Sequence, residues 1–217
     1  MPAAIRDQLF RRVLIADGAM GTMLQGFDLD LDDFEGYEGC NEVLNRSRPD
    51  VVAEIHRAYL AAGADCIETN TFGANLAALG EYGISEQVAE LAEAGARIAR
   101  RVADEFSTPG RPRFVLGSVG PGTKLPTLGH IEATTIRDGY QTQVEAMIRG
   151  GIDAVQIETS QDLQQAKAAV IGAKRACAAQ GVDLPIFVSI TVETTGSMLL
   201  GSETGAALAT LAPLGID

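Results

Sequence analysis

Two stretches of this 217-residue sequence decide its fold class: AGADCIETNTF at Ala62–Phe72 and GGIDAVQIETS at Gly150–Ser160. In each, a glycine and an aspartate lead into a short apolar run that ends in Ile-Glu-Thr. Near-continuous apolar runs of this length are typical of parallel strands that are covered on both faces. The sequence therefore repeats one strand signal, and each copy ends in a carboxylate.

Working outward from these two copies, apolar runs and helical patterns alternate along the chain. Strands are predicted at 12–17, 65–70, 113–120, 154–159 and 185–192, and helices at 48–63, 85–106, 134–151, 160–181 and 201–215. Pro49 and Gly63 are the expected start and stop of the first helix, and Ser85 is the expected N-cap of the second. This alternation predicts an α/β fold with a parallel sheet and right-handed crossovers.

The first turn decides which parallel sheet is expected. The stretch ADGAMGTML has glycines only at 18 and 21, so it lacks the GxGxxG pattern of a dinucleotide-binding open sheet. A (β/α)8 TIM barrel, which needs about 250 residues, fits better. We predict one incomplete barrel domain over residues 1–217, with about the first five βα units present. The closing LGID at Leu214–Asp217 repeats the lead-in to a strand, so truncation before strand six is expected.

Composition limits the partners and the compartment. A net charge of −12 argues against nucleic acid or an anionic membrane as a partner. No stretch has the length and apolarity of a signal peptide or a membrane span. Cys40, Cys66 and Cys177 are odd in number and widely spaced, so they predict no disulfide framework, and a cytoplasmic location is expected. For Cys66 and Cys177 we expect packing roles.

The carboxyl ends of the predicted strands form the candidate site, as in other barrels. Acidic residues follow several of these strands: Asp17, Glu68, Glu158 and Glu193. Carboxylates without matching lysine or arginine suit an ammonium group or a metal ion and do not suit a phosphate.

Structural roles compete with this interpretation. Asp17 could simply cap its turn, and strand alternation could point Glu68 or Glu158 toward the helices. His56 is expected to be a packing or surface residue within a helix, and His130 is a candidate ligand contact in a loop.

Five segments taken together resemble the homocysteine S-methyltransferase domain at the N-terminus of cobalamin-dependent methionine synthases. They cover nearly the whole chain: LIADGAMGTMLQ, GCNEVLNRSRPDVVAEIHRAYLAAGADCIETNTFGAN, GSVGPGTKLPT, GIDAVQIETSQDL and SITVETTGSMLLGSETGAAL. The resemblance implies a (β/α)8 barrel that binds homocysteine and zinc, with cobalamin and folate domains elsewhere in the full-length chain. It places all three zinc-ligating cysteines beyond Asp217. No metal ligand, no catalytic residue and no bound cofactor is therefore expected within residues 1–217.

The same resemblance carries over the amino-acid-binding half of the site. It implies that Asp17 and Glu158 contact the homocysteine ammonium, and that the amides of the turn at Gly18, Ala19 and Met20 receive its carboxylate. Thr69, Asn70 and Phe72 are the implied pocket residues.

Three functions stay open at this point. The first is a part of methionine synthase that transfers a methyl group from methylcobalamin and is inactive alone. The second is a stand-alone zinc methyltransferase that uses betaine or S-methylmethionine. The third is a non-catalytic protein that self-associates through the open barrel edge, because unpaired strand edges pair readily.

Overall fold

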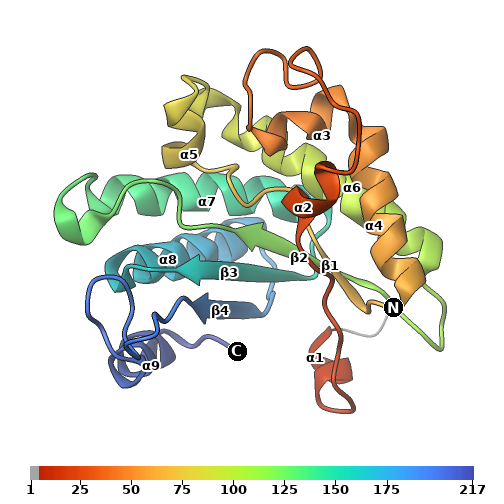
Figure 1. Ribbon diagram of the computed structural model, residues 1–217. Helices are drawn as coiled ribbons and strands as arrows, with labels where there is room; N and C mark the ends of the chain where they lie inside the picture. Colours follow the sequence, from red (N-terminus) through yellow and green to blue (C-terminus); the bar gives the residue numbers. More distant parts are fainter. Residues whose placement is uncertain (1–4) are drawn as a thin grey trace.

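The computed structural model describes residues 5–217, in which four parallel strands form one sheet in the order β1-β2-β3-β4 (Figure 1). The strands are β1 (Cys66–Glu68), β2 (Phe114–Val119), β3 (Ala154–Ser160) and β4 (Ile186–Ile190). Strand order follows chain order throughout, as in a barrel, whereas a doubly wound sheet reverses direction at a switch point. The predicted strands at 65–70, 113–120, 154–159 and 185–192 are thereby confirmed.

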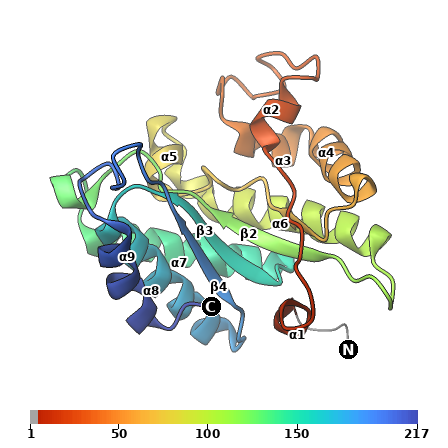
Figure 2. The ribbon, with the colours of Figure 1, turned by 60° about the horizontal axis from the view of Figure 1, so that its bottom comes forward.

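The helices cover one face of this sheet. Figure 2 shows α9, α8, α7 and α6 following one another across that face, with α4 beyond them. The longer helices are α4 (Pro49–Ala62), α6 (Val88–Phe106), α7 (Ala133–Gly150), α8 (Leu163–Gln180) and α9 (Thr204–Leu211). Short helices and turns fill the connections: α1 (Ile5–Leu9), α2 (Met20–Leu24), η1 (Asn41–Val43), α3 (Leu44–Ser47), α5 (Leu76–Glu81), η2 (Ser85–Gln87), η3 (Pro126–Leu128) and η4 (Ala212–Leu214).

Local sequence signals explain several helix ends. Helix α4 starts at Pro49 and ends before Gly63, whose φ of 118° is the left-handed conformation that stops a helix. Asp162 caps α8 by accepting hydrogen bonds from the amides of Gln164 and Gln165. The prediction for Ser85 is wrong: it opens the 3₁₀ turn η2, and its hydroxyl donates to the Leu76 carbonyl.

The two faces of the sheet have different environments. Side chains such as Ile67, Val115 and Ile157 are buried in the large core between the sheet and the helices. On the opposite face, Cys66 and Leu116 pack with Ile5 of helix α1 in a smaller cluster. Helix α1 therefore closes one end of the face that would be the interior of a barrel, and the carboxyl end of that face stays open for a site.

The cysteines and His56 take packing roles. Cys40, Cys66 and Cys177 are all buried and free, as expected for Cys66 at the start of a strand and Cys177 within a helix. His56 is fully buried in α4 and belongs to the core rather than to a site.

The predicted first strand at 12–17 is wrong in extent. Only an isolated parallel bridge forms there, between Ala16 and Cys66. The Ile15 carbonyl accepts from the Asp65 and Cys66 amides, and the Asp17 amide donates to the Cys66 carbonyl. Val13 is 79% exposed and Ile15 is 56% exposed, so this segment buries too little apolar surface to form a longer ladder. The result is an incomplete barrel of four strands and one bridge.

Asp65 fastens this weakly paired segment to β1. Its buried carboxylate accepts from the Arg12 guanidinium at 2.8 and 3.0 Å and from the Ile15 amide at 3.1 Å. Arg113, which is also buried, lies 3.5 Å away. Arg111 lies 3.9 Å from the same carboxylate, which thus balances three guanidinium groups and holds the chain just before Asp17.

Replacing this carboxylate should cost much of the domain's stability. Asp65→Asn is expected to lower the free energy of unfolding by about 3 kcal/mol, because the buried Arg113 loses its counter-charge. Chemical denaturation of the 217-residue chain measures this. The control is Asp183→Asn, an exposed partner of Arg6, which should cost less than about 1 kcal/mol. Equal effects of the two substitutions would contradict the role given to Asp65.

Candidate functional site

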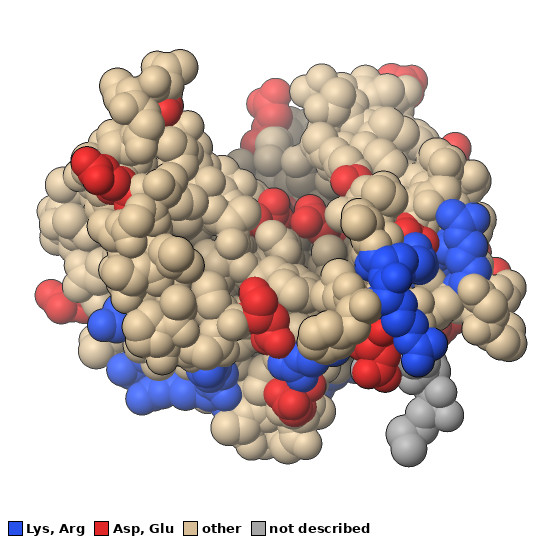
Figure 3. Space-filling model, turned by 90° about the horizontal axis from the view of Figure 1, so that it is seen from below, with Lys and Arg blue, Asp and Glu red and all other residues tan. Residues whose placement is uncertain are grey.

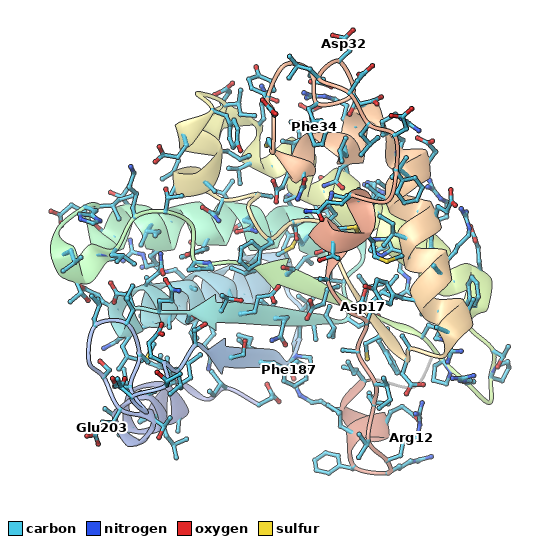
Figure 4. All side chains as sticks on the ribbon, viewed as in Figure 1. Arg12, Asp17, Asp32, Phe34, Phe187 and Glu203 are labelled. Carbon is cyan, nitrogen blue, oxygen red and sulfur yellow. The ribbon has the colours of Figure 1, made fainter. Side chains whose placement is uncertain are left out.

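Asp17 is held in place by the main chain of strand β1. Both of its carboxylate oxygens accept from the Glu68 amide, each at 3.1 Å. Asp17 lies on the segment between α1 and α2, beside β1 (Figure 4). The turn that follows is tied down by Tyr59 of α4, whose hydroxyl donates to the Ala19 carbonyl at 3.1 Å. The capping role that competed for Asp17 is therefore replaced by a contact between neighbouring chain segments.

The end of β1 is anchored by buried polar side chains. The Thr69 hydroxyl accepts from the Ser118 amide at 3.0 Å and lies 2.6 Å from the Thr71 hydroxyl. The Asn70 side chain donates to the Asn41 carbonyl and to the Asn45 side chain. These bonds use much of the hydrogen-bonding capacity of Thr69 and Asn70, so both residues build the wall of the site.

Phe72 is placed by a close backbone contact with Gly120. The Gly120 amide donates to the Phe72 carbonyl at 3.1 Å. A Cβ at position 120 would lie 2.6 Å from that carbonyl oxygen and 2.8 Å from the ring, which is closer than atoms can pack. Phe72 can therefore take this position only because residue 120 is a glycine. Phe72 is 44% exposed and lines the pocket.

A break in the ladder at the end of β3 shapes the backbone around Glu158. The register between β3 and β4 shifts between Ile157 and Ser160, and Thr159 has a φ of 58°. Such an irregularity re-aims side chains at a strand end. Ile157 is buried against the helices, whereas Glu158 lies in the pocket and accepts a hydrogen bond from the Ser118 hydroxyl.

These elements enclose one pocket of about 470 Å³ at the carboxyl ends of the strands. The pocket brings together every residue to which the family resemblance gives a role, together with Glu68 and Ser118. Its lining is Asp17, Gly18, Ala19, Met20, Gly21, Asn41, Glu42, Glu68, Thr69, Asn70, Phe72, Ser118 and Glu158. The outward orientation considered for Glu68 or Glu158 is wrong, because both line this pocket.

The pocket is acidic and holds no balancing cation. Burial, with Glu68 and Glu158 nearby, raises the pKa of Asp17 to about 8. Burial and Glu158 raise the pKa of Glu68 to about 7. Burial also raises the pKa of Glu158, and the Ser118 hydroxyl offsets part of that effect. No lysine or arginine is among the pocket residues in the described chain. Figure 3 shows acidic atoms inside the central hollow and basic atoms toward the margins of that face.

Two residues named from the sequence lie outside the pocket. Glu193 is exposed in a turn beyond β4, where its amide donates to the Ser197 carbonyl. His130 is exposed in the loop before α7, and it does not line the pocket.

Sequence reasoning missed Gly21, Asn41 and Glu42. Glu42 is buried, accepts from the Gly73 amide at 2.7 Å and lies 3.7 Å from the Cys40 thiol. The only sequence signal for it was its place in the segment GCNEV, within one of the family-like stretches.

The described residues do not fit a zinc site. Within residues 5–217 no group of three His, Cys, Asp or Glu side chains is arranged to hold a metal ion. Burial raises the pKa of Cys40 and of Cys66 to about 12, so neither thiol favours the thiolate that zinc requires. Across the same residues, none of the helices is both long and apolar enough to span a membrane.

Comparison with known proteins places these features in a family. A family model described as homocysteine S-methyltransferase matches residues 14–217. Over 211 residues the chain is 59% identical to methionine synthase from Mycobacterium tuberculosis, covering 97% of this chain and 18% of that protein. Identity to methionine synthase from Mycobacterium leprae is also 59%, with the same coverage. The chain thus spans about a fifth of the length of these relatives.

Solved structures share the fold. The homocysteine methyltransferase MmuM from Escherichia coli, in its metallated form, matches with a TM-score of 0.77 at 22% identity. The match covers 97% of this chain and 74% of that one. The oxidised form matches with a TM-score of 0.76 at 23% identity. The predicted incomplete (β/α)8 barrel is confirmed by this likeness.

The raised pKa values predict how stability depends on pH. The folded chain holds protons on Asp17 and Glu68 that the unfolded chain releases near pH 4, so stability should fall as the pH rises from about 4 to 8. Asp17→Asn should therefore be more stable than the wild type at pH 8 by about 2 kcal/mol or more, and nearly equal to it at pH 4. Denaturation at both pH values measures the difference. Asp28→Asn, an exposed residue away from the pocket, should show no such pH-dependent gain.

Proposed function

The chain belongs to the homocysteine S-methyltransferase family, and we propose that its pocket binds the amino-acid end of homocysteine within a longer methionine synthase. One observation carries this proposal. Asp17, Glu68 and Glu158 face one pocket that has no cationic side chain among the described residues. An ammonium group would neutralise part of this charge with hydrogen bonds that are stronger than neutral ones.

Each predicted residue has a proposed part in that binding. Asp17 and Glu158 accept hydrogen bonds from the ligand ammonium. The backbone amides of Gly18 to Met20 receive the ligand carboxylate, in a turn that Tyr59 holds through Ala19. Thr69, Asn70 and Phe72 form the wall along which the side chain of the ligand lies.

Activation of the ligand sulfur needs a metal site that residues 5–217 do not provide. A free thiol is mostly protonated near neutral pH, and the thiolate is the nucleophile. Zinc would supply this activation, and the described residues provide no ligand set for it. We propose that cysteines outside this chain hold the zinc, and that residues 1–217 alone do not transfer a methyl group. Cobalamin as methyl carrier and folate as its source would be bound by other parts of the longer protein.

The choice of methyl donor rests on similarity. The chain is 59% identical to two methionine synthases, and only 22% identical to the homocysteine methyltransferase MmuM. This difference supports a cobalamin-dependent methionine synthase over an enzyme that uses betaine or S-methylmethionine. Neither donor contacts the pocket residues in this proposal, so the site itself is common to both possibilities.

The role of Glu158 can be tested in the natural full-length protein. Glu158→Gln keeps the size of the side chain and removes its charge. It should raise the KM for homocysteine by about tenfold or more, because a charged contact to the ammonium is lost. Steady-state kinetics with varied homocysteine measures this. Glu193→Gln is the matched control and should leave the KM unchanged. An unchanged KM for Glu158→Gln refutes the assignment.

Metal analysis tests the proposal that the zinc ligands lie outside this chain. The purified 217-residue chain is expected to bind no stoichiometric zinc, because its cysteines are buried and lie in separate segments of the chain. Inductively coupled plasma mass spectrometry after dialysis gives the zinc content per chain. One tightly held zinc, retained in the double variant Cys66→Ser/Cys177→Ser, would show that ligands within this chain have been overlooked.

A further inference from the structure

Glu68 serves the pocket with two different groups. Its backbone amide holds the Asp17 carboxylate, as described above. Its own carboxylate lines the pocket, and within residues 5–217 no hydrogen bond to that carboxylate is formed. The other three carboxylates of the pocket are engaged, since Asp17 accepts from the Glu68 amide, Glu158 from the Ser118 hydroxyl and Glu42 from the Gly73 amide. Glu68 is thus the pocket carboxylate with the greatest unused capacity to accept a hydrogen bond.

We propose that Glu68 is a third carboxylate of the ammonium subsite and makes the pocket selective for ligands with a free α-ammonium group. This assignment rests on the proposed function and deepens it. Among the acidic residues, the family resemblance gives a role only to Asp17 and Glu158, and the role of Glu68 is inferred from the geometry of the pocket.

The repeated Ile-Glu-Thr stretch supports the assignment. Ile67 and Ile157 are both buried against the helices, and the glutamate that follows each of them lies in the pocket. Between the two strands lies β2, which contributes Ser118 to the same wall. Glu68 and Glu158 therefore approach a common ligand from two sides of Ser118.

Glu42 shows what a carboxylate with a purely structural role looks like in this wall. It is more deeply buried than Glu68, and its two oxygens are occupied by the Gly73 amide and the Cys40 thiol. Glu68 has neither kind of partner in the described chain. The comparison separates a carboxylate that builds the wall from one that is available to a ligand.

Protons should compete with the ligand at this subsite. Burial and the Glu158 charge hold the pKa of Glu68 at about 7, so a cation binds best once that proton has left. Affinity for an ammonium-bearing ligand should therefore rise between pH 6 and pH 8. The titratable side chains that line the pocket with Glu68 are Asp17, Glu42 and Glu158, and Tyr59 holds the turn at Ala19 beside them.

The test uses the full-length protein, isothermal titration calorimetry and two probes of similar shape. Methionine carries the ammonium but has no free thiol, so thiol activation does not enter the result. The second probe, 4-(methylthio)butanoate, lacks the ammonium. Glu68→Gln should weaken methionine binding by about tenfold or more and leave 4-(methylthio)butanoate binding unchanged or tighter. It should also flatten the pH dependence of methionine binding.

The possible results separate the two proposals. Unchanged methionine affinity in Glu68→Gln, beside a loss in Glu158→Gln, overturns the assignment of Glu68 alone. Equal weakening of both probes also overturns it, because that pattern marks a structural effect. Failure of the wild type to bind methionine or homocysteine overturns the proposed function itself, and the role of Glu68 with it. Glu193→Gln serves again as the control that should match the wild type.

Discussion

The site depends on one interaction, the pair of hydrogen bonds from the Glu68 amide to the Asp17 carboxylate. The segment that carries Asp17 forms only one bridge to the sheet, so regular strand pairing does not fix its position. Asp65 holds the chain just before it, and Tyr59 holds the turn just after it. The amide of Glu68 also compensates part of the cost of burying the Asp17 charge. Strand β1 thereby sets the spacing of two carboxylates at once.

A cluster of buried carboxylates lowers the stability of the folded chain, and a bound cation would offset part of that cost. Burial and neighbouring negative charge destabilise the ionised form of a carboxyl group. In this pocket the pKa values of Asp17, Glu68 and Glu158 are all raised. The hydroxyl of Ser118 relieves only one of them. A bound ammonium group would favour the ionised forms of these carboxyl groups and offset part of the cost of their burial. Functional sites often carry such strain, which the rest of the fold must tolerate.

The sequence was informative where a pattern is local. Buried apolar runs predicted β1 to β4, and Pro49 and Gly63 predicted the ends of α4. Asp17 and Glu158 could be placed at one mouth because parallel strands end at the same edge. Glu193 also follows a strand, yet it lies in a turn where its side chain is exposed to solvent. The local sequence did not predict that turn. Glu42 could not be found because its burial depends on Gly73, which is distant in sequence and becomes its neighbour only in the folded chain.

The contact between Gly120 and Phe72 has a consequence for how this pocket can diversify. Because the main chain of Phe72 rests against Gly120, which follows strand β2 and has no side chain, its course does not depend on the side chain at position 72. Exchange of the aromatic ring can therefore widen or narrow the opening while the backbone stays still. A side chain at 120 would instead displace that backbone and alter every contact along it. Position 72 can thus accept other side chains without a shift of the backbone, whereas position 120 cannot.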